Sequence, residues 1–141
     1  MPPTARRELG DRGELLVADW LRQQGWAIAA QQWHCRWGEL DLVARHTNPD
    51  VGLAFVEVKT RRRSGMDQGG RLAITPQKQH KLWRSAQTFL SQHPQYGELP
   101  CRFDVAIVIR GRAIGGLATT QEGTPYLTLV EYIENAFQIS S

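Results

Sequence analysis

Two apolar segments decide the fold: residues 38–45 read Gly-Glu-Leu-Asp-Leu-Val-Ala-Arg, and residues 53–60 read Leu-Ala-Phe-Val-Glu-Val-Lys-Thr. Side chains two apart on a β-strand share a face, so Leu40 and Leu42 are expected on one face and Asp41 on the other. Between the segments, Thr-Asn-Pro-Asp at 47–50 and Gly52 have the composition of a turn. The segments are therefore predicted to form an antiparallel hairpin.

Apolar patterns predict further elements on both sides of this hairpin. Residues 5–24 have the three- and four-residue spacing of an amphipathic helix that stops at Gly25, and 26–33 resemble a strand. Residues 61–74 are interpreted as a loop rich in glycine and arginine. Thr75 and Pro76 then begin a helix, as N-cap and first helical residue, and His93-Pro94 ends it.

The last third of the chain predicts one central strand and smaller additions. Residues 103–109 are almost continuously apolar, which is typical of a strand buried on both faces and reached by a helical crossover. Segments 113–119 and 126–132 are expected to add edge strands or a hairpin, while 134–141 are weakly specified. The order helix, three strands, helix, strand predicts an α/β sandwich around a mixed sheet, in a single domain over residues 1–141.

Composition excludes several classes of protein. No apolar run is long enough to cross a bilayer and no secretory signal precedes the first helix, so a cytoplasmic protein without a membrane partner is expected. Two cysteines are too few for a disulfide framework or a structural zinc site. The net charge of +3 is modest, but basic residues gather at 61–63 and 78–84 while the chain from Glu122 onward has none. This asymmetry suits a nucleic-acid surface, although a solvated surface gives the same pattern.

The predicted hairpin places two acids and a lysine together. Asp41 and Glu57 lie on adjacent strands and can converge at one end, and Glu57 and Lys59 share a face. Two carboxylates, with the Val58 carbonyl as a further ligand, suit Mg²⁺, which keeps several of its waters. A lysine beside them can orient a metal-bound water for phosphodiester hydrolysis. The alternative is a cross-strand salt bridge in which Lys59 reaches solvent.

Several other residues are ambiguous on the sequence alone. Glu14 falls at the edge of the first helix's apolar stripe, where an exposed glutamate paired with Arg7 or Arg12 is the simpler interpretation. Asp104 lies within the apolar strand and is interpreted as structural, although the sequence names no partner for it. The tryptophans are expected in the core, with Trp37 the exception because it adjoins the catalytic hairpin.

The motifs taken together resemble those of a known family. They are Gly-x-x-Gly-Glu at 10–14, Gly-Glu-Leu-Asp-Leu-Val at 38–43, Phe-Val-Glu-Val-Lys-Thr-Arg at 55–61, Thr-x-x-Lys at 75–78, Arg-Phe-Asp-Val at 102–105 and Ile-Glu-Asn-Ala-Phe at 133–137. In order and spacing they look like the YraN-like family of small bacterial proteins, which is similar to PD-(D/E)xK nucleases and archaeal Holliday-junction resolvases. The resemblance implies a restriction-endonuclease-like three-layer sandwich and catalytic roles for Glu14, Asp41, Glu57 and Lys59.

These observations lead to one expected function and two alternatives. We expect a nuclease that uses Mg²⁺, with Mn²⁺ as a substitute, and acts on DNA rather than RNA, in particular structured DNA. The residues expected to contact nucleic acid are Arg12, Arg36, Arg61, Arg62, Arg63, Lys78 and Lys81. A homodimer is expected only by analogy with other nucleases of this fold. The alternatives are a non-catalytic nucleic-acid-binding protein that keeps the fold, and an interaction protein whose acid cluster is structural.

Overall fold

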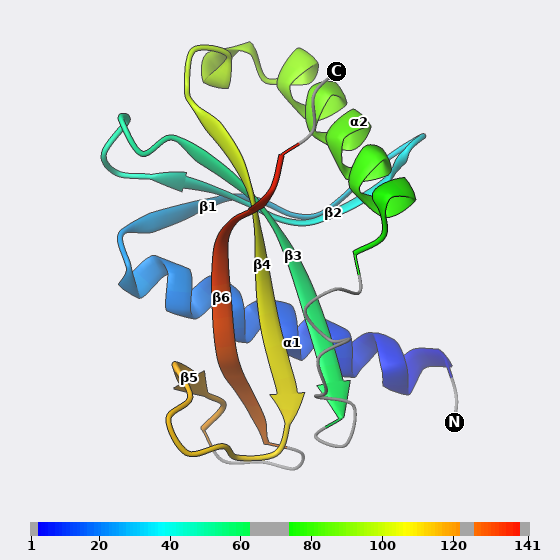
Figure 1. Ribbon diagram of the computed structural model, residues 1–141, viewed down its shortest axis with the longest axis vertical. Coiled ribbons are helices and arrows are strands. Elements are labelled where there is room, and N and C mark those ends of the chain that lie inside the picture. The colour runs from blue at the N-terminus through cyan, green and yellow to red at the C-terminus, as the bar shows by residue number, and fades with distance from the viewer. Residues whose placement is uncertain (1–2, 63–73, 122–125, 139–141) are drawn as a thin grey trace.

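The computed structural model describes residues 3–62, 74–121 and 126–138 (Figure 1). Its helices are α1 (Pro3–Gln23), α2 (Pro76–Gln92) and the short 3-10 helix η3 (Pro94–Tyr96). Its strands are β1 (Trp26–Cys35), β2 (Gly38–His46), β3 (Leu53–Arg62), β4 (Cys101–Arg110), β5 (Ala118–Thr119) and β6 (Leu127–Phe137). The predicted order of helix, three strands, helix and strand is confirmed.

The strands form one mixed sheet in the order β1-β2-β3-β4-β6-β5. β3 and β4 are parallel and are joined through α2, whereas the other neighbours pair antiparallel. Alternate strand residues pack into two separate cores, one with α1 and one with α2. The helices therefore cover opposite faces, and the chain is a three-layer α/β sandwich of the restriction-endonuclease-like kind (Figure 1).

The helix boundaries follow the local signals in the sequence. The Thr75 side chain accepts a hydrogen bond from the Lys78 amide at 3.1 Å, and Pro76 occupies the first helical position, as predicted. α2 ends at Gln92, before His93 and Pro94. On α1 the predicted apolar stripe is buried, and the chain reverses at Gly25, whose φ of +95° lies in the left-handed region that glycine tolerates.

The ends of β3 and β6 differ most from the prediction. β3 continues through Arg61 and Arg62, because it stays paired with β4 as far as Arg62; the predicted loop therefore begins later, and residues 63–73 lie outside the described residues. β6 extends to Phe137, so residues 134–137 belong to a strand and not to a weakly specified tail. β6 lies between β4 and β5 and pairs antiparallel with β5, as the predicted addition of edge strands or a hairpin allows, so the edge strands of the described sheet are β1 and the two-residue β5.

Within residues 3–62, 74–121 and 126–138, neither helix has an apolar stretch long enough to span a bilayer.

Candidate functional site

β2 and β3 pair over only part of their length and then diverge. Their antiparallel ladder ends at the pair Leu42–Val56, while β3 continues beside β4 as far as Arg62. The next residues toward the opening are Asp41 on β2 and Glu57 on β3. Figure 1 shows the two strands separating on the side of the sheet where α1 begins. The two predicted acids therefore lie where the strands part, a place we call the fork.

Asp41 holds the fork in shape. Its Oδ2 atom accepts a hydrogen bond from the Val58 amide at 2.9 Å, in place of a backbone partner from β2. β2 also changes face here, because Leu40 packs in the core beneath α2 whereas Leu42 packs in the core beneath α1. The prediction that Leu40 and Leu42 share a face is therefore wrong. The alternation of a regular strand is lost where β2 leaves the ladder.

Glu57 is buried, with two ammonium groups beside one of its oxygens. Its Oε1 atom lies 3.9 Å from the Nζ of Lys59 and 3.9 Å from the Nζ of Lys78. Its Oε2 atom is buried without a hydrogen-bond partner. Lys59 comes from the same strand, on the same face, as strand periodicity predicts. Lys78 comes from the first turn of α2, and the sequence alone did not place it beside the acids.

Glu14 reaches the fork from the opposite layer, because α1 lies unusually close to β3. A Cβ atom at Gly13 would lie 2.5 Å from the Thr60 Oγ1 atom, so a larger residue would require the Thr60 side chain or α1 to shift. Glu14, the next residue, lines the same cavity as Asp41 and Glu57. Its Oε1 atom is buried without a hydrogen-bond partner, so Glu14 is not the exposed glutamate of the simpler interpretation.

The fork opens into a cavity of about 750 Å³ between α1 and the sheet. It is lined by Leu9, Gly10, Glu14, Asp41, Glu57, Val58, Thr60, Arg61, Arg62 and Arg110. Its floor is thus acidic and its rim is basic. Arg110 was missed by the sequence analysis, although it ends the apolar β4 strand and parallel pairing places it opposite Arg62. A charged residue directly after a buried strand was the available signal.

The crowding of acids changes their ionisation. Burial, followed by the neighbouring Asp41 charge, raises the pKa of Glu57 to about 7 and that of Glu14 to about 8. Burial also raises the pKa of Asp41, against the hydrogen bond from Val58, and lowers the pKa of Lys59. Each acid thus favours uptake of a proton or another cation at neutral pH. Such paired perturbations in a cavity are typical of functional sites.

The fork fits a hard divalent cation on its own donor atoms. Glu57 and Glu14 each have a buried oxygen without a hydrogen-bond partner, and such an atom is costly unless it acquires one. Among the residues that the structure describes, no three His, Cys, Asp or Glu side chains lie close enough together to form a metal site. A cation held by Asp41 and Glu57 would therefore need other kinds of ligand, such as a backbone carbonyl and several waters, which is how Mg²⁺ is usually bound.

The remaining predicted nucleic-acid residues lie in different places. Arg61 and Arg62 line the cavity, whereas Arg12 lines a second cavity of about 510 Å³ between α1 and β5. Arg36 lies in the turn between β1 and β2, and Lys81 is exposed on α2. Arg63 lies outside the described residues.

Asp104 is fully buried and belongs to a structural network. It accepts hydrogen bonds from the Arg102 Nε at 3.1 Å, the Tyr132 hydroxyl at 2.6 Å and the Asn135 amide at 2.9 Å. The Asn135 amide is available because β6 leaves its regular register opposite Asp104. All of these contacts connect β4 to itself or to β6, so the structural interpretation of Asp104 is confirmed.

A three-layer α/β sandwich with a strand fork at its centre places the chain in the restriction-endonuclease-like fold class. Residues 13–108 match the model described as "Uncharacterised protein family UPF0102". A UPF0102 protein of Synechococcus sp. (strain JA-3-3Ab) is 49% identical, with 96% of this chain and 95% of that protein covered. Another from the same strain is 52% identical, with 99% of each covered. The UPF0102 protein of Acaryochloris marina (strain MBIC 11017) is 55% identical, covering 72% of this chain and 62% of that protein. The chain belongs to the UPF0102 family, which confirms its resemblance to YraN-like proteins.

Proposed function

We propose that this protein is a Mg²⁺-dependent endonuclease that hydrolyses phosphodiester bonds in DNA, and in structured DNA in particular. The observation that supports this most is the fork, where Asp41 and Glu57 converge beside Lys59 and the Glu57 Oε2 atom has no hydrogen-bond partner. A buried carboxylate oxygen of this kind has the chemistry of a cation ligand. The resemblance to PD-(D/E)xK nucleases supports the same interpretation.

The chain's own residues would divide the work. Asp41 and Glu57 would hold Mg²⁺, with the Val58 carbonyl as a further ligand, and Mn²⁺ would substitute. When bound, the ion neutralises charge on the phosphate and makes a coordinated water more acidic. Lys59, whose side chain is only 14% exposed, would orient the attacking water by donating a hydrogen bond. Burial lowers the pKa of this lysine, which brings it closer to the range useful for proton transfer.

Other residues at the fork would position the substrate. Glu14 would complete the acidic floor by accepting a hydrogen bond from a metal-bound water. Lys78, which shares the Glu57 oxygen with Lys59, would be released to a phosphate once a cation takes over the pairing of Glu57. Arg61, Arg62 and Arg110 at the rim would contact neighbouring phosphates without reading sequence. Affinity would then fall steeply with salt.

One observation favours the second candidate, a non-catalytic nucleic-acid-binding protein. Within the described residues no third ligating side chain completes a metal site. In that case Lys59 and Lys78 simply neutralise Glu57, and the basic rim alone binds nucleic acid. In the third candidate, an interaction protein, the acids contribute to stability alone.

A cleavage panel distinguishes these candidates. Purified protein is incubated with Mg²⁺ or Mn²⁺ and with linear, nicked and four-way DNA and matching RNA, while binding is measured in parallel. The endonuclease proposal expects metal-dependent cuts that Lys59→Ala abolishes. Binding of every substrate without cleavage would leave the non-catalytic candidate, and neither binding nor cleavage would leave the interaction protein.

A further inference from the structure

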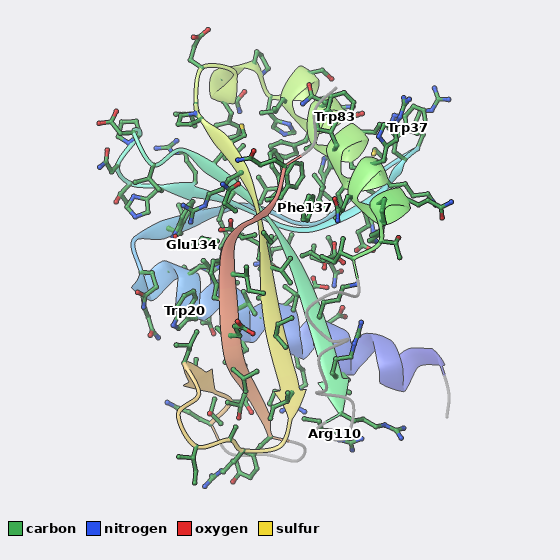
Figure 2. All side chains as sticks on the ribbon, in the orientation of Figure 1. Trp20, Trp37, Trp83, Arg110, Glu134 and Phe137 are labelled. Atoms are coloured by element: carbon green, nitrogen blue, oxygen red, sulfur yellow. The ribbon has the colours of Figure 1, made fainter. Side chains whose placement is uncertain are left out.

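A second cationic surface lies away from the fork, where the turn between β1 and β2 meets α2. The guanidinium carbon of Arg36 lies 4.6 Å from the centre of the Trp37 ring, and that of Arg84 lies 4.4 Å from it. Figure 2 shows Trp37 beside α2, far from Arg110, which lies where β4 ends beside β3. Trp37 is thus not a core residue, and its half-exposed ring supports two arginines from separate elements. We call these three residues the tryptophan clamp.

The clamp is connected to the fork by a row of cations on α2. Lys78, Lys81 and Arg84 recur every three residues, which forms an inclined row on a helix surface. Lys78 lies beside Glu57, and Arg84 lies six residues later, or about 9 Å along the helix axis. α2 has no Asp or Glu anywhere in its sequence. Along α2, a row of three cations with no acidic residue between them therefore runs from the fork toward the clamp.

The clamp's arginines are positioned but not neutralised. Within the part of the chain that the structure describes, Arg36 contacts the Trp37 ring, and Arg84 contacts that ring and the His80 Nε2 atom, at 3.1 Å from its Nε. Neither forms an ion pair there. A guanidinium lying over an indole ring is held in one orientation and still presents N–H groups to an anion. Holding the arginine in advance reduces the entropy lost on binding.

We propose that the tryptophan clamp is a second nucleic-acid contact, which binds the phosphate backbone about two to three nucleotides from the phosphate at the fork. That separation follows from the roughly 9 Å of helix between Lys78 and Arg84 and the rise of about 3.4 Å per nucleotide of a duplex strand. The clamp proposal rests on the proposed function, because the fork defines where the reacting phosphate lies. An anionic membrane surface is disfavoured, because the large exposed apolar side chains of the described residues, Leu15, Ile114 and Leu117, belong to α1 and the β4–β5 connection. Trp37 acts here as a positioning residue.

Binding of a fluorescent four-way DNA, measured by anisotropy in EDTA across a salt series, tests the proposal. Arg36→Ala/Arg84→Ala should weaken binding about tenfold and flatten the plot of log affinity against log salt by about 1.8, the slope of two phosphate contacts. Arg22→Ala/Arg45→Ala is the matched control, because it removes two exposed arginines at the opposite end of β1 and β2. It should change affinity less than twofold. Trp37→Ala, which removes no charge, should weaken binding by itself.

Equal losses in the clamp variant and the control, or unchanged binding by Trp37→Ala, would overturn the proposal. So would wild-type protein that binds phosphatidylserine vesicles and not DNA, with the binding lost in the clamp variant. Arg36→Lys/Arg84→Lys keeps the charges without the planar stacking, so an intermediate affinity is expected. Matching urea midpoints for all variants establish that each is folded.

A small substrate separates this proposal from the proposed function. Bis(p-nitrophenyl) phosphate reaches the fork but is too short to reach the clamp. If both proposals hold, the clamp variant hydrolyses this diester at the wild-type rate and cuts DNA slowly. If the wild type cuts nothing but the clamp variant still binds DNA more weakly than the control, the endonuclease proposal fails and the clamp stands. If the wild type and the clamp variant cut DNA equally well, the clamp proposal fails while the endonuclease proposal stands.

Discussion

Glu57→Gln should flatten the pH dependence of stability in the metal-free protein. Burial and the Asp41 charge raise the pKa of Glu57 from its ordinary 4.5 to about 7. Between these two values the folded protein holds a proton that the unfolded chain has released. The free energy of unfolding therefore falls as pH rises through this window, and the loss is complete above about pH 7. At roughly 1.4 kcal/mol for each pKa unit, the whole loss amounts to about 3–4 kcal/mol.

The assay is urea unfolding followed by tryptophan fluorescence, in EDTA, at intervals from about pH 5 to about pH 8. Over this range, which leaves out the lowest part of the window, wild-type protein should lose about 2–3 kcal/mol more than Glu57→Gln. The comparison largely removes the contributions of groups that both proteins share, including Glu14 and Asp104. Mg²⁺ added at the upper end should restore stability to the wild type alone, because a cation replaces the missing proton. Parallel curves for the two proteins would refute the reasoning.

Three further predictions concern stability and use the same unfolding assay. Gly13→Ala should be about 1–3 kcal/mol less stable than Gly10→Ala, because the new Cβ would meet the Thr60 hydroxyl whereas nothing lies within 4 Å of Gly10; equal stabilities would disprove the close approach of α1. Thr75→Ala should lower the free energy of unfolding by about 1 kcal/mol because it removes the side-chain cap of α2, and Thr75→Ser should retain most of that stability. Asp104→Ala should cost about 3 kcal/mol or more, since it leaves buried donors without their acceptor; a loss below about 1 kcal/mol would contradict the network.

Local patterns were sufficient for most of the fold. Thr75-Pro76 and Gly25 marked helix boundaries because capping and left-handed backbone depend on the residue itself. The length of β3 and the placement of β6 were less predictable, because both depend on pairing with β4. Arg61 and Arg62 have the composition of a loop, yet the parallel partner keeps them in the strand.

The candidate site was predictable where its members lie on one strand. Two-residue periodicity placed Glu57 and Lys59 together, and the hairpin placed Asp41 near them. The divergence of β2 and β3 was not encoded in any local pattern, so the change of face at Leu40 was missed. Lys78 was missed beside Glu57 for a related reason, because its position depends on how α2 packs over the fork.

The partners of Asp104 and the close approach of Gly13 required the tertiary structure. Tyr132 and Asn135 are 28 and 31 residues away from Asp104 in the sequence. Gly13 reads as an ordinary helix glycine until β3 is placed against it. In each case the determinant is a contact between elements, which single-sequence periodicity does not contain.

The central claim is that the fork hydrolyses phosphodiesters with the help of Lys59. Its most direct test is the single-turnover rate of cutting labelled four-way DNA with Mg²⁺, for wild type, Lys59→Ala and Arg45→Ala purified in parallel. We predict equal rates for wild type and Arg45→Ala, and a rate at least about 100-fold lower for Lys59→Ala. Bound but uncut DNA in all three, or cleavage by Lys59→Ala at the wild-type rate, would contradict the claim.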